Sequence, residues 1–196
     1  MTRKYELKRR AERQNETRQR IVDAAIQLHR TKGPARTTLS DVARAAGVER
    51  HTLYRHFPDE RAISLACSGH FFQLHPPPDP AVWRPAVGER ERLRAGLGDL
   101  YAWYELVEDM FTCVLRDAEV HPLTREVVEL RGAEPMSRIR QTLAAGLGRG
   151  KRVQAVLDLA LDFHAWQRLR RSGLDSAAAA DLMAESVVCA DHRRQP

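Results

Sequence analysis

The sequence predicts an all-α protein with a small N-terminal three-helix domain and a larger C-terminal helical domain. Apolar residues recur every three or four positions through most of the chain, as they do on one face of a helix. No segment alternates polar and apolar residues as a strand would. Glycine and proline clusters at 33–34 and 76–80 separate the helical segments. We expect a basic arm at 1–15, a first domain at 16–60 and a second domain at 61–196.

The N-terminal segment, residues 1–15, carries six basic residues among two glutamates. Such a segment is typical of a disordered, solvated terminus, and it would equally suit an arm that holds DNA phosphates or enters the minor groove. From Glu16 onward the pattern becomes helical, with apolar residues between Ile21 and Leu28 on one face. The pair Gly33-Pro34 predicts the end of this first helix.

Residues 37–57 predict two short helices joined by a tight turn. Thr38 or Ser40 can cap the first of them, and Asp41 then lies in its first turn, where a carboxylate suits the positive end of the helix dipole. Gly47 follows directly, at a place where a helix end commonly needs a positive φ. This arrangement is a helix-turn-helix.

The second of these helices is predicted to read DNA. Leu53 and Phe57 point inward one turn apart, so the remaining side chains form an outward face of donors, cations and one aromatic ring. Phosphates and base edges bind such groups. We expect Arg50, His51, Thr52 and Tyr54 to face the major groove, and Thr38, Arg55 and His56 to hold phosphates. The guanidinium of Arg50 fits the O6/N7 edge of guanine, with a phosphate contact as the alternative.

Four short runs in this stretch carry a resemblance to a known family. They are Thr37-Thr38-Leu39, Asp41-Val42-Ala43, Ala46-Gly47-Val48 and Thr52-Leu53-Tyr54-Arg55-His56-Phe57, and the acidic pair Asp59-Glu60 follows them. In this order they resemble the tetracycline-repressor (TetR) family of bacterial transcription regulators. Glu49 and His51 stand where that family usually has a small polar residue and a glycine, and a lysine often found after the His-Phe pair is missing, with Glu60 near its place. These departures bear on base preference and phosphate anchoring.

The resemblance implies a sequence-specific DNA-binding transcriptional regulator, usually a repressor, that binds a palindromic operator as a homodimer. A small hydrophobic or aromatic effector would release it. The alternative is a constitutive or architectural DNA-binding dimer whose C-terminal domain only dimerises or binds a protein partner. We expect no enzymatic activity, because the sequence has no nucleophile elbow, glycine-rich phosphate loop or HExxH motif. No cofactor or metal is expected, since Cys67, His70 and His75 do not have the spacing of a recognised zinc set.

Every segment beyond the first domain again predicts helix. A fourth helix should run to about Leu74, and in this family that helix links the two parts of the chain. Two helical stretches should extend from Gly88 to Ala118, and glycines inside the first of them predict a bend or loose packing. A further helix should begin at Pro122 and kink or break at Pro135.

Residues 151–171 predict one helix that is apolar on most sides, which is typical of a helix buried on most sides. A final helix from about Asp175 carries small residues that permit close approach of a neighbour. A four-helix contact with the same pair in a second chain would bury these surfaces, and the TetR resemblance implies a homodimer formed in this way. The expected interface residues are Val153, Val156, Ala160, Leu182, Met183 and Val187.

An effector pocket in the second domain would draw its walls from the helices near 97–114 and 156–167. The side chains there are apolar or aromatic, with a cysteine and a histidine as polar or polarisable points. They would select a neutral, hydrophobic or planar compound. The expected lining residues are Leu97, Tyr101, Tyr104, Met110, Phe111, Cys113, Val114, Phe163, His164 and Trp166.

The positive charge lies in the part that carries the helix-turn-helix. Residues 1–61 hold 15 Lys+Arg against 8 Asp+Glu, a balance of +7, whereas residues 62–196 hold 17 against 18, a balance of −1. This distribution favours a polyanionic partner such as double-stranded DNA.

The three cysteines form an odd set without a CxxC spacing, which argues against a disulfide framework and for a reducing compartment. No run of 18 apolar residues predicts a membrane span, and the charged N-terminus does not resemble a secretory signal. We therefore expect a cytoplasmic protein with no membrane partner.

Overall fold

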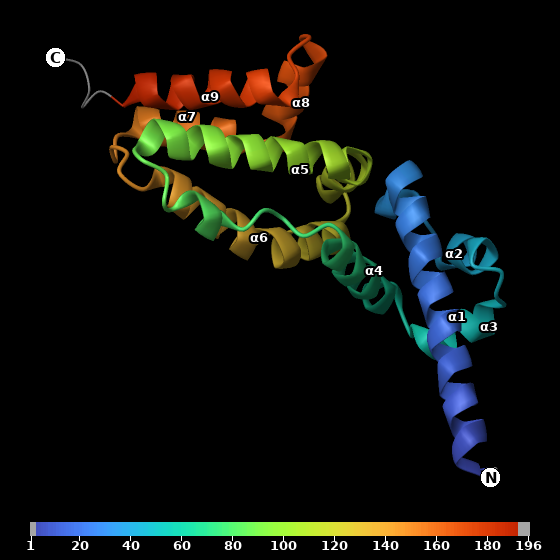
Figure 1. Cartoon of the computed structure of the whole chain (residues 1–196). Coiled ribbons are helices and arrows are strands. Elements are labelled where there is room, and N and C mark those ends of the chain that lie inside the picture. The colour runs from blue at the N-terminus through green and yellow to red at the C-terminus, as the bar shows by residue number, and fades with distance from the viewer. Residues whose placement is uncertain (1–2, 192–196) are drawn as a thin grey trace. The chain divides into compact units, whose positions relative to one another are not determined.

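The computed structural model describes residues 3–191, and within them it contains nine α-helices, two short 3-10 helices and no strand (Figure 1). The all-α prediction is confirmed. No helix among the described residues combines the length and the apolar character that crossing a membrane requires. In chain order the elements are α1 (Arg3–Thr31), η1 (Pro34–Arg36), α2 (Leu39–Ala45), α3 (Arg50–His56), α4 (Glu60–Leu74), η2 (Pro80–Trp83), α5 (Glu89–Ala118), α6 (Pro122–Ala144), α7 (Lys151–Ala160), α8 (Phe163–Arg171) and α9 (Ser176–Ala190).

The chain folds into two compact units. The first comprises Met1–Leu74 and Asp109–Arg131, and the second comprises His75–Glu108 and Gly132–Pro196. Helices α5 and α6 each contribute to both units, and the hairpin that joins them belongs to the first. This division differs from the boundary expected after residue 60, because α4 packs against α1 and the tip of the α5–α6 hairpin packs with the same unit.

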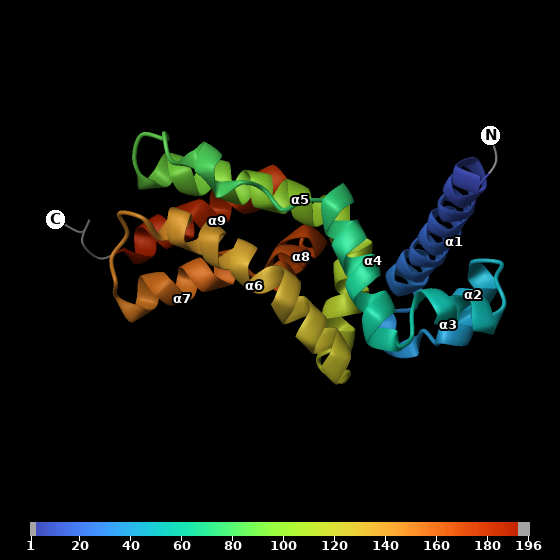
Figure 2. The same ribbon diagram turned by 90° about the horizontal axis from the view of Figure 1, so that it is seen from below.

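The first unit is built around α1, with α2 and α3 together on one side of it (Figures 1 and 2). Its core holds Ile21, Val22 and Ala25 of α1 and Leu53 of α3, all at most 1% exposed. The tip of the α5–α6 hairpin is also bonded to α4 of this unit, for example by a hydrogen bond of 2.9 Å from Arg131 Nη2 to the carbonyl of Leu65.

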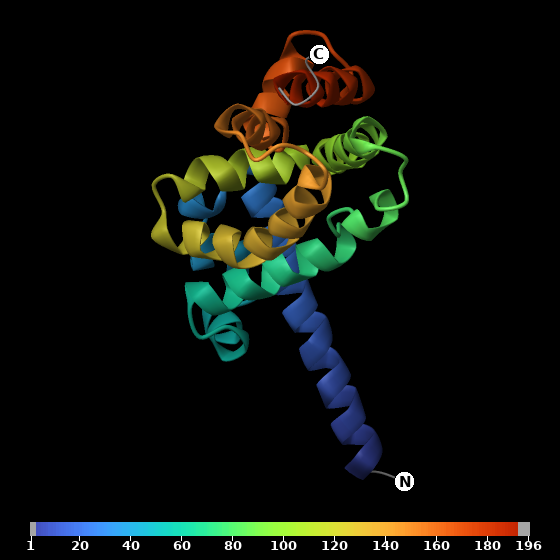
Figure 3. The ribbon, with the colours of Figure 1, turned by 90° about the vertical axis from the view of Figure 1, so that its left-hand side faces the viewer.

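Helix α1 begins at Arg3 rather than at Glu16, so the segment expected as an arm is the first half of a helix of 29 residues. The reason is visible in the sequence: residues 3–15 contain no glycine or proline and are rich in Lys, Arg and Glu, which favour helix. Figure 3 shows this half of α1 continuing past the other helices of its unit.

In the second unit, the helix expected over 151–171 is two helices, α7 and α8. The break lies at Leu161 and Asp162, where the Asp162 carboxylate accepts a hydrogen bond of 2.7 Å from the backbone N–H of Ala165 and so caps α8. Both helices pack against α9. Apolar periodicity alone could not predict the break, because the apolar pattern continues across it.

The two other long helices are each assigned as one continuous helix. Helix α5 is continuous, and a Cβ on Gly96 would lie 2.4 Å from Leu143 Cδ2 and 3.0 Å from the ring of Trp83. This glycine therefore permits the close approach of α6 and η2, so the loose packing expected at this position is wrong. Helix α6 likewise continues through Pro135 without a break.

Candidate nucleic-acid interface

Helix α2 begins with a complete capping box. Thr38 Oγ1 accepts a hydrogen bond of 3.1 Å from the backbone N–H of Asp41, while the Asp41 carboxylate accepts one of 3.2 Å from the backbone N–H of Thr38. The Thr38 hydroxyl also donates to this carboxylate, and these bonds lower the pKa of Asp41. Because the hydroxyl is committed to the cap, a DNA phosphate would compete with Asp41 for it.

The turn between α2 and α3 has the geometry predicted from its glycine. Gly47 has a φ of +64°, the left-handed conformation in which a side chain is strained. Its N–H donates to the carbonyl of Arg44 at 3.2 Å, and the N–H of Val48 donates to the carbonyl of Ala43 at 3.0 Å. This pair of bonds is a Schellman motif. It fixes the direction in which the chain enters α3.

Helix α3 buries one side and exposes the other. Leu53 and Phe57 are at most 1% exposed, which agrees with their predicted inward positions. Arg50 and Tyr54 lie together on the exposed side, with 3.4 Å between Arg50 Nη2 and Tyr54 Oη and 5.8 Å between the guanidinium carbon and the centre of the ring. A neutral partner of this kind orients Arg50 without cancelling its charge. His51 and Arg55 are exposed as well, and Thr52 is half-buried.

His56 is less suited to a phosphate contact than predicted. Its side chain is half-buried, and Nε2 is buried without a hydrogen-bond partner among the described residues. Burial, together with the nearby charges of Arg55 and Arg18, lowers the pKa of His56, which disfavours the charged form of the ring. The helical pattern did not reveal that this ring would be half-buried.

Arg18 of α1 adjoins α3, the helix predicted to read DNA, and was not among the predicted site residues. Its guanidinium carbon lies 4.7 Å from the centre of the Phe57 ring, a cation–π contact. A signal for it exists in the sequence, since Arg18 falls three residues before Ile21 and seven before Ala25, on the face that α1 buries. A cation in register with an apolar face has its stem against the neighbouring helix and its charge at the rim.

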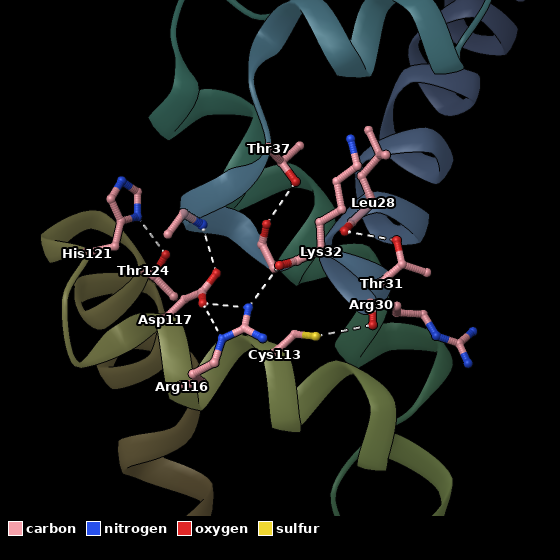
Figure 4. A network of polar contacts seen from close by, with 12 residues as sticks. Leu28, Arg30, Thr31, Lys32, Thr37, Cys113, Arg116, Asp117, His121 and Thr124 are labelled. Atoms are coloured by element: carbon pink, nitrogen blue, oxygen red, sulfur yellow. Dashed lines mark hydrogen bonds and ion pairs between the residues drawn. The ribbon is translucent and has the colours of Figure 1, made fainter.

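Contacts from the end of α5 fix the chain just before α2 (Figure 4). The carboxylate of Asp117, which is 3% exposed, accepts hydrogen bonds of 2.9 Å from the N–H of Ala35 and of 2.8 Å from Arg116 Nε. Arg116 Nη2 in turn donates to the carbonyl of Lys32 at 2.8 Å. We call these contacts the Asp117 clamp. They satisfy backbone groups at the end of α1 and in the turn that leads into the helix-turn-helix.

Gly33 lies inside the Asp117 clamp. Its φ is +93°, and a Cβ placed on it would be 2.2 Å from Asp117 Oδ2 and 2.4 Å from Arg116 Nη2. One sign of this contact is present in the sequence, because Asp117 falls in register with Met110 and Cys113 on the inward face of α5. Which backbone group the buried carboxylate would bind could not be predicted from that register.

Residues 21–67 match the family model described as bacterial regulatory proteins, tetR family. This segment is a TetR-family helix-turn-helix domain. The chain is also similar to curated proteins over part of its length. It is 36% identical over 69 residues to the HTH-type transcriptional regulator TtgR of Pseudomonas putida, covering 35% of this chain and 33% of that protein. It is 47% identical over 45 residues to AcrR of Shigella flexneri, covering 23% and 21%.

The chain thus spans about a third of the length of TtgR, and the likeness over the remainder is one of fold. The transcriptional regulator FadR of Bacillus subtilis, solved in complex with stearoyl-CoA, superposes with a TM-score of 0.62 at 16% identity. That superposition covers 88% of this chain and 98% of that one. A TetR-family regulator of Mesorhizobium loti superposes with a TM-score of 0.61 at 18% identity over 91% of this chain and 96% of that one, so the chain has the fold of that family, an N-terminal helix-turn-helix and a C-terminal helical domain.

The predicted effector residues do not lie in one compact unit. Tyr101, Tyr104, Phe163 and Trp166 cluster in the second unit, with ring centres 5.3 Å apart for Tyr104 and Phe163 and 5.4 Å apart for Phe163 and Trp166. Leu97 is buried in the same unit. By contrast, four predicted lining residues belong to the first unit, namely Met110, Phe111, Cys113 and Val114. His164 belongs to the second unit, but its side chain is exposed.

The hydroxyl groups of the aromatic cluster are used within the chain. Tyr101 Oη donates to the carbonyl of Ala160 at 2.8 Å, and Tyr104 Oη donates to that of Leu161 at 2.6 Å. Burial raises the pKa of both tyrosines, so both hydroxyls keep their protons. These two bonds hold the corner between α7 and α8 against α5, since they satisfy carbonyl groups that the end of α7 leaves unpaired.

Most of the predicted interface residues point into their own chain. Val153, Ala160, Met183 and Val187 are at most 7% exposed, so they cannot form the contact expected of them. The apolar pattern marks residues that are buried within the chain, where α7 and α9 pack against each other. Of the six residues, only Val156, which is half-buried, and Leu182, which is 46% exposed, remain accessible to a partner.

A buried histidine gives the TetR-family domain a pH dependence. His29 is 9% exposed, and its Nδ1 lies 3.5 Å from Cys67 Sγ in the contact of α1 with α4. Burial lowers the pKa of His29 to about 4, although Asp117 acts in the opposite direction. Burial also raises the pKa of Cys67 to about 12, so the pair is neutral. No group of three or more His, Cys, Asp or Glu among the described residues is arranged to hold a metal.

We expect the folded state to lose stability as the pH falls from about 6.5 to about 4, because the unfolded chain takes up a proton on His29 first. The loss from this group should approach roughly 3 kcal/mol at the lower end. Urea denaturation across this pH range measures it. His29→Gln should flatten the dependence, whereas His51→Gln, at an exposed position, should leave it unchanged. Parallel curves for the wild type and His29→Gln would contradict the assignment.

Proposed function

We propose that the chain is a sequence-specific DNA-binding transcriptional regulator that binds a palindromic operator as a homodimer, usually to repress. The observation that carries this proposal is the exposed face of α3. Arg50 has no carboxylate partner among the described residues, and its side chain is exposed together with those of Tyr54 and His51. The Schellman motif before α3 fixes the direction of the helix that carries them. Donors held in a fixed direction on one short helix suit the edges of bases in the major groove.

The electrostatics of the first unit support the same partner. The excess of basic residues lies in residues 1–61, and a polyanion would be attracted to that part of the chain. TtgR and AcrR, each of which is similar to part of this chain, are named as HTH-type transcriptional regulators. No reaction is proposed for the chain, and its location in the cytoplasm stays a prediction.

Replacing Arg50 by alanine tests the reading role of α3. Once an operator has been selected from random duplexes, Arg50→Ala should lose roughly 1–3 kcal/mol of binding free energy per half-site and relax the preference at one base pair. A repeated selection with the variant measures both effects. Arg50→Lys keeps the charge but not the bidentate fork, so it should not restore the base preference.

The control for this experiment is Arg84→Ala, an exposed arginine of the second unit. It should bind the operator as the wild type does. Equal weakening of Arg50→Ala on every sequence, with rescue by Arg50→Lys, would make Arg50 a phosphate contact. If the wild type selects no sequence at all, the proposal of a sequence-specific regulator is wrong.

We further propose that a small hydrophobic or aromatic effector releases the operator. The support is the fold shared with FadR, a regulator solved with stearoyl-CoA, and the apolar character of the second unit. A ligand can release DNA only by preferring the state that cannot bind it, so operator DNA must weaken ligand binding by the same factor. Titration of a hydrophobic ligand with and without operator measures this linkage.

One observation favours the alternative of a constitutive DNA-binding dimer. The rings of Tyr101, Tyr104, Phe163 and Trp166 pack against one another, and both tyrosine hydroxyls are bonded inside the chain. Such a cluster has the character of a packed core, in which aromatic rings serve stability. Equal ligand affinity with and without operator would support this alternative.

A further inference from the structure

The first half of α1 is a helix whose described side chains are almost all open to solvent. It precedes the segment 21–67 that matches the TetR family, so that match does not explain it. Of the side chains from Lys8 to Arg20, all are exposed except Thr17, which is half-buried. A helix whose side chains are exposed on every side gains little from packing, and its ordering must be supported in another way.

The charges on this helix select the kind of partner. Residues 8–20 contain six basic and two acidic side chains, a net charge of +4, and one apolar side chain, Ala11. Without an apolar face the helix cannot enter a membrane interface or fill a hydrophobic groove. What it offers is a row of cations, for which a polyanion is the complementary partner.

Three of the arginines share one face. Arg9, Arg13 and Arg20 are spaced by four and seven residues, which brings them into line along the helix, and all three are exposed. Like charges four residues apart destabilise an isolated helix, and a bound anion removes that repulsion. Within the described part of the chain, no carboxylate pairs with Arg13 or Arg20.

The position of this helix relative to α3 is fixed by a contact inside the first unit. Arg18 stacks on Phe57, the residue that follows α3, and from this contact the residues before Arg18 continue past the other helices of the unit. Figures 1 and 3 show this extension. At 1.5 Å per residue, residues 3–17 reach about 22 Å, which corresponds to about 7 base pairs of duplex.

We infer that the first half of α1 is a second DNA contact, which binds the phosphate backbone of the duplex flanking each half-site. This inference rests on the proposed function, since it requires α3 to occupy the operator. The contact reads no bases, because arginines on an exposed helix meet phosphates first, and it adds affinity on long DNA rather than specificity. The protein then has a footprint longer than the sequence that α3 selects.

The test compares two duplexes, the selected operator alone and the operator extended by about 10 base pairs at each end. The wild type should bind the extended duplex more tightly. The triple variant Arg9→Gln, Arg10→Gln, Arg13→Gln should lose this advantage, at least about 10-fold near physiological salt, with a slope of log K against log salt reduced by roughly 2 to 5. On the operator alone it should bind as the wild type does.

A matched control removes three positive charges from exposed positions of the second unit, in the variant Arg84→Gln, Arg149→Gln, Lys151→Gln. It should keep the wild-type preference for the extended duplex. Circular dichroism checks that the triple variant of α1 remains helical. If the wild type binds both duplexes equally, or if both triple variants behave alike, the inference is wrong while the proposed function stands. If the wild type selects no operator, the proposed function itself fails.

Discussion

Replacing Gly33 by alanine should destabilise the first unit by about 3–5 kcal/mol, a large share of the stability of an ordinary domain. Two effects combine at this position. The backbone conformation, with φ +93° and ψ 157°, is almost restricted to glycine. The added Cβ would also lie 2.2 Å from Asp117 Oδ2, whose carboxylate is buried and bound to the N–H of Ala35 and so cannot retreat cheaply.

Gly47→Ala is the matched control, because Gly47 also has a positive φ, of +64°, but nothing lies within 4 Å of an added Cβ. It should cost about 1–2 kcal/mol, the strain of the left-handed conformation alone. Urea denaturation measures the free energy of unfolding of both variants, and the difference between them is the cost of the clash with Asp117. Similar losses for the two would mean that the Asp117 clamp moves aside and does not fix the chain before α2.

If the chain forms the proposed homodimer through α9, placing a glutamate at Leu182 should convert the dimer into monomers and reduce operator affinity by roughly 100-fold or more. Leu182 is 46% exposed on α9. A symmetric homodimer would bring the glutamates of both chains into one interface, and burying these unpaired charges is costly. Two separate chains then bind the two half-sites independently, without the high effective concentration that a dimer gives its second DNA-binding domain. Sedimentation and binding to one full operator measure the two effects.

Leu106→Glu serves as the control, because Leu106 is a 61% exposed leucine on α5 of the same unit. It should remain dimeric and bind the operator normally. A glutamate at Val187 would be uninformative, since that side chain is fully buried and the chain itself would unfold. If Leu182→Glu stays dimeric and binds the operator unchanged, the interface lies elsewhere.

The parts of the fold that depend on neighbours in sequence were predictable. The capping residue Thr38, the positive φ of Gly47 and the inward positions of Leu53 and Phe57 each follow from rules that span a few residues. Such rules are strong in a helix-turn-helix because its turn leaves little freedom. The start of α1 was missed for the opposite reason, because a helix with no apolar face gives no periodic signal.

The parts that depend on distant contacts were not predictable. Apolar periodicity identified α7 and α9 as buried helices, but it could not say whether Val153 and Met183 face their own chain or a second one. In the same way, a register on α5 indicated that Asp117 is buried without showing that Ala35 donates to it. Periodicity reports how much of a helix is covered, whereas the identity of the covering surface depends on the whole fold.

The shared helices α5 and α6 have a consequence for how the protein is made and how its parts can be recombined. The first unit includes Asp109–Arg131, so a ribosome must synthesise about two thirds of the chain before the last residue of that unit emerges. A gene fragment that ends after Leu74 would encode every helix that reads DNA and omit Asp117, which satisfies the N–H of Ala35. Exchange of DNA-binding specificity between relatives therefore requires the transfer of two segments together, residues 1–74 and residues 109–131. A single crossover after α4 would combine the first segment of one protein with the α5–α6 hairpin of the other.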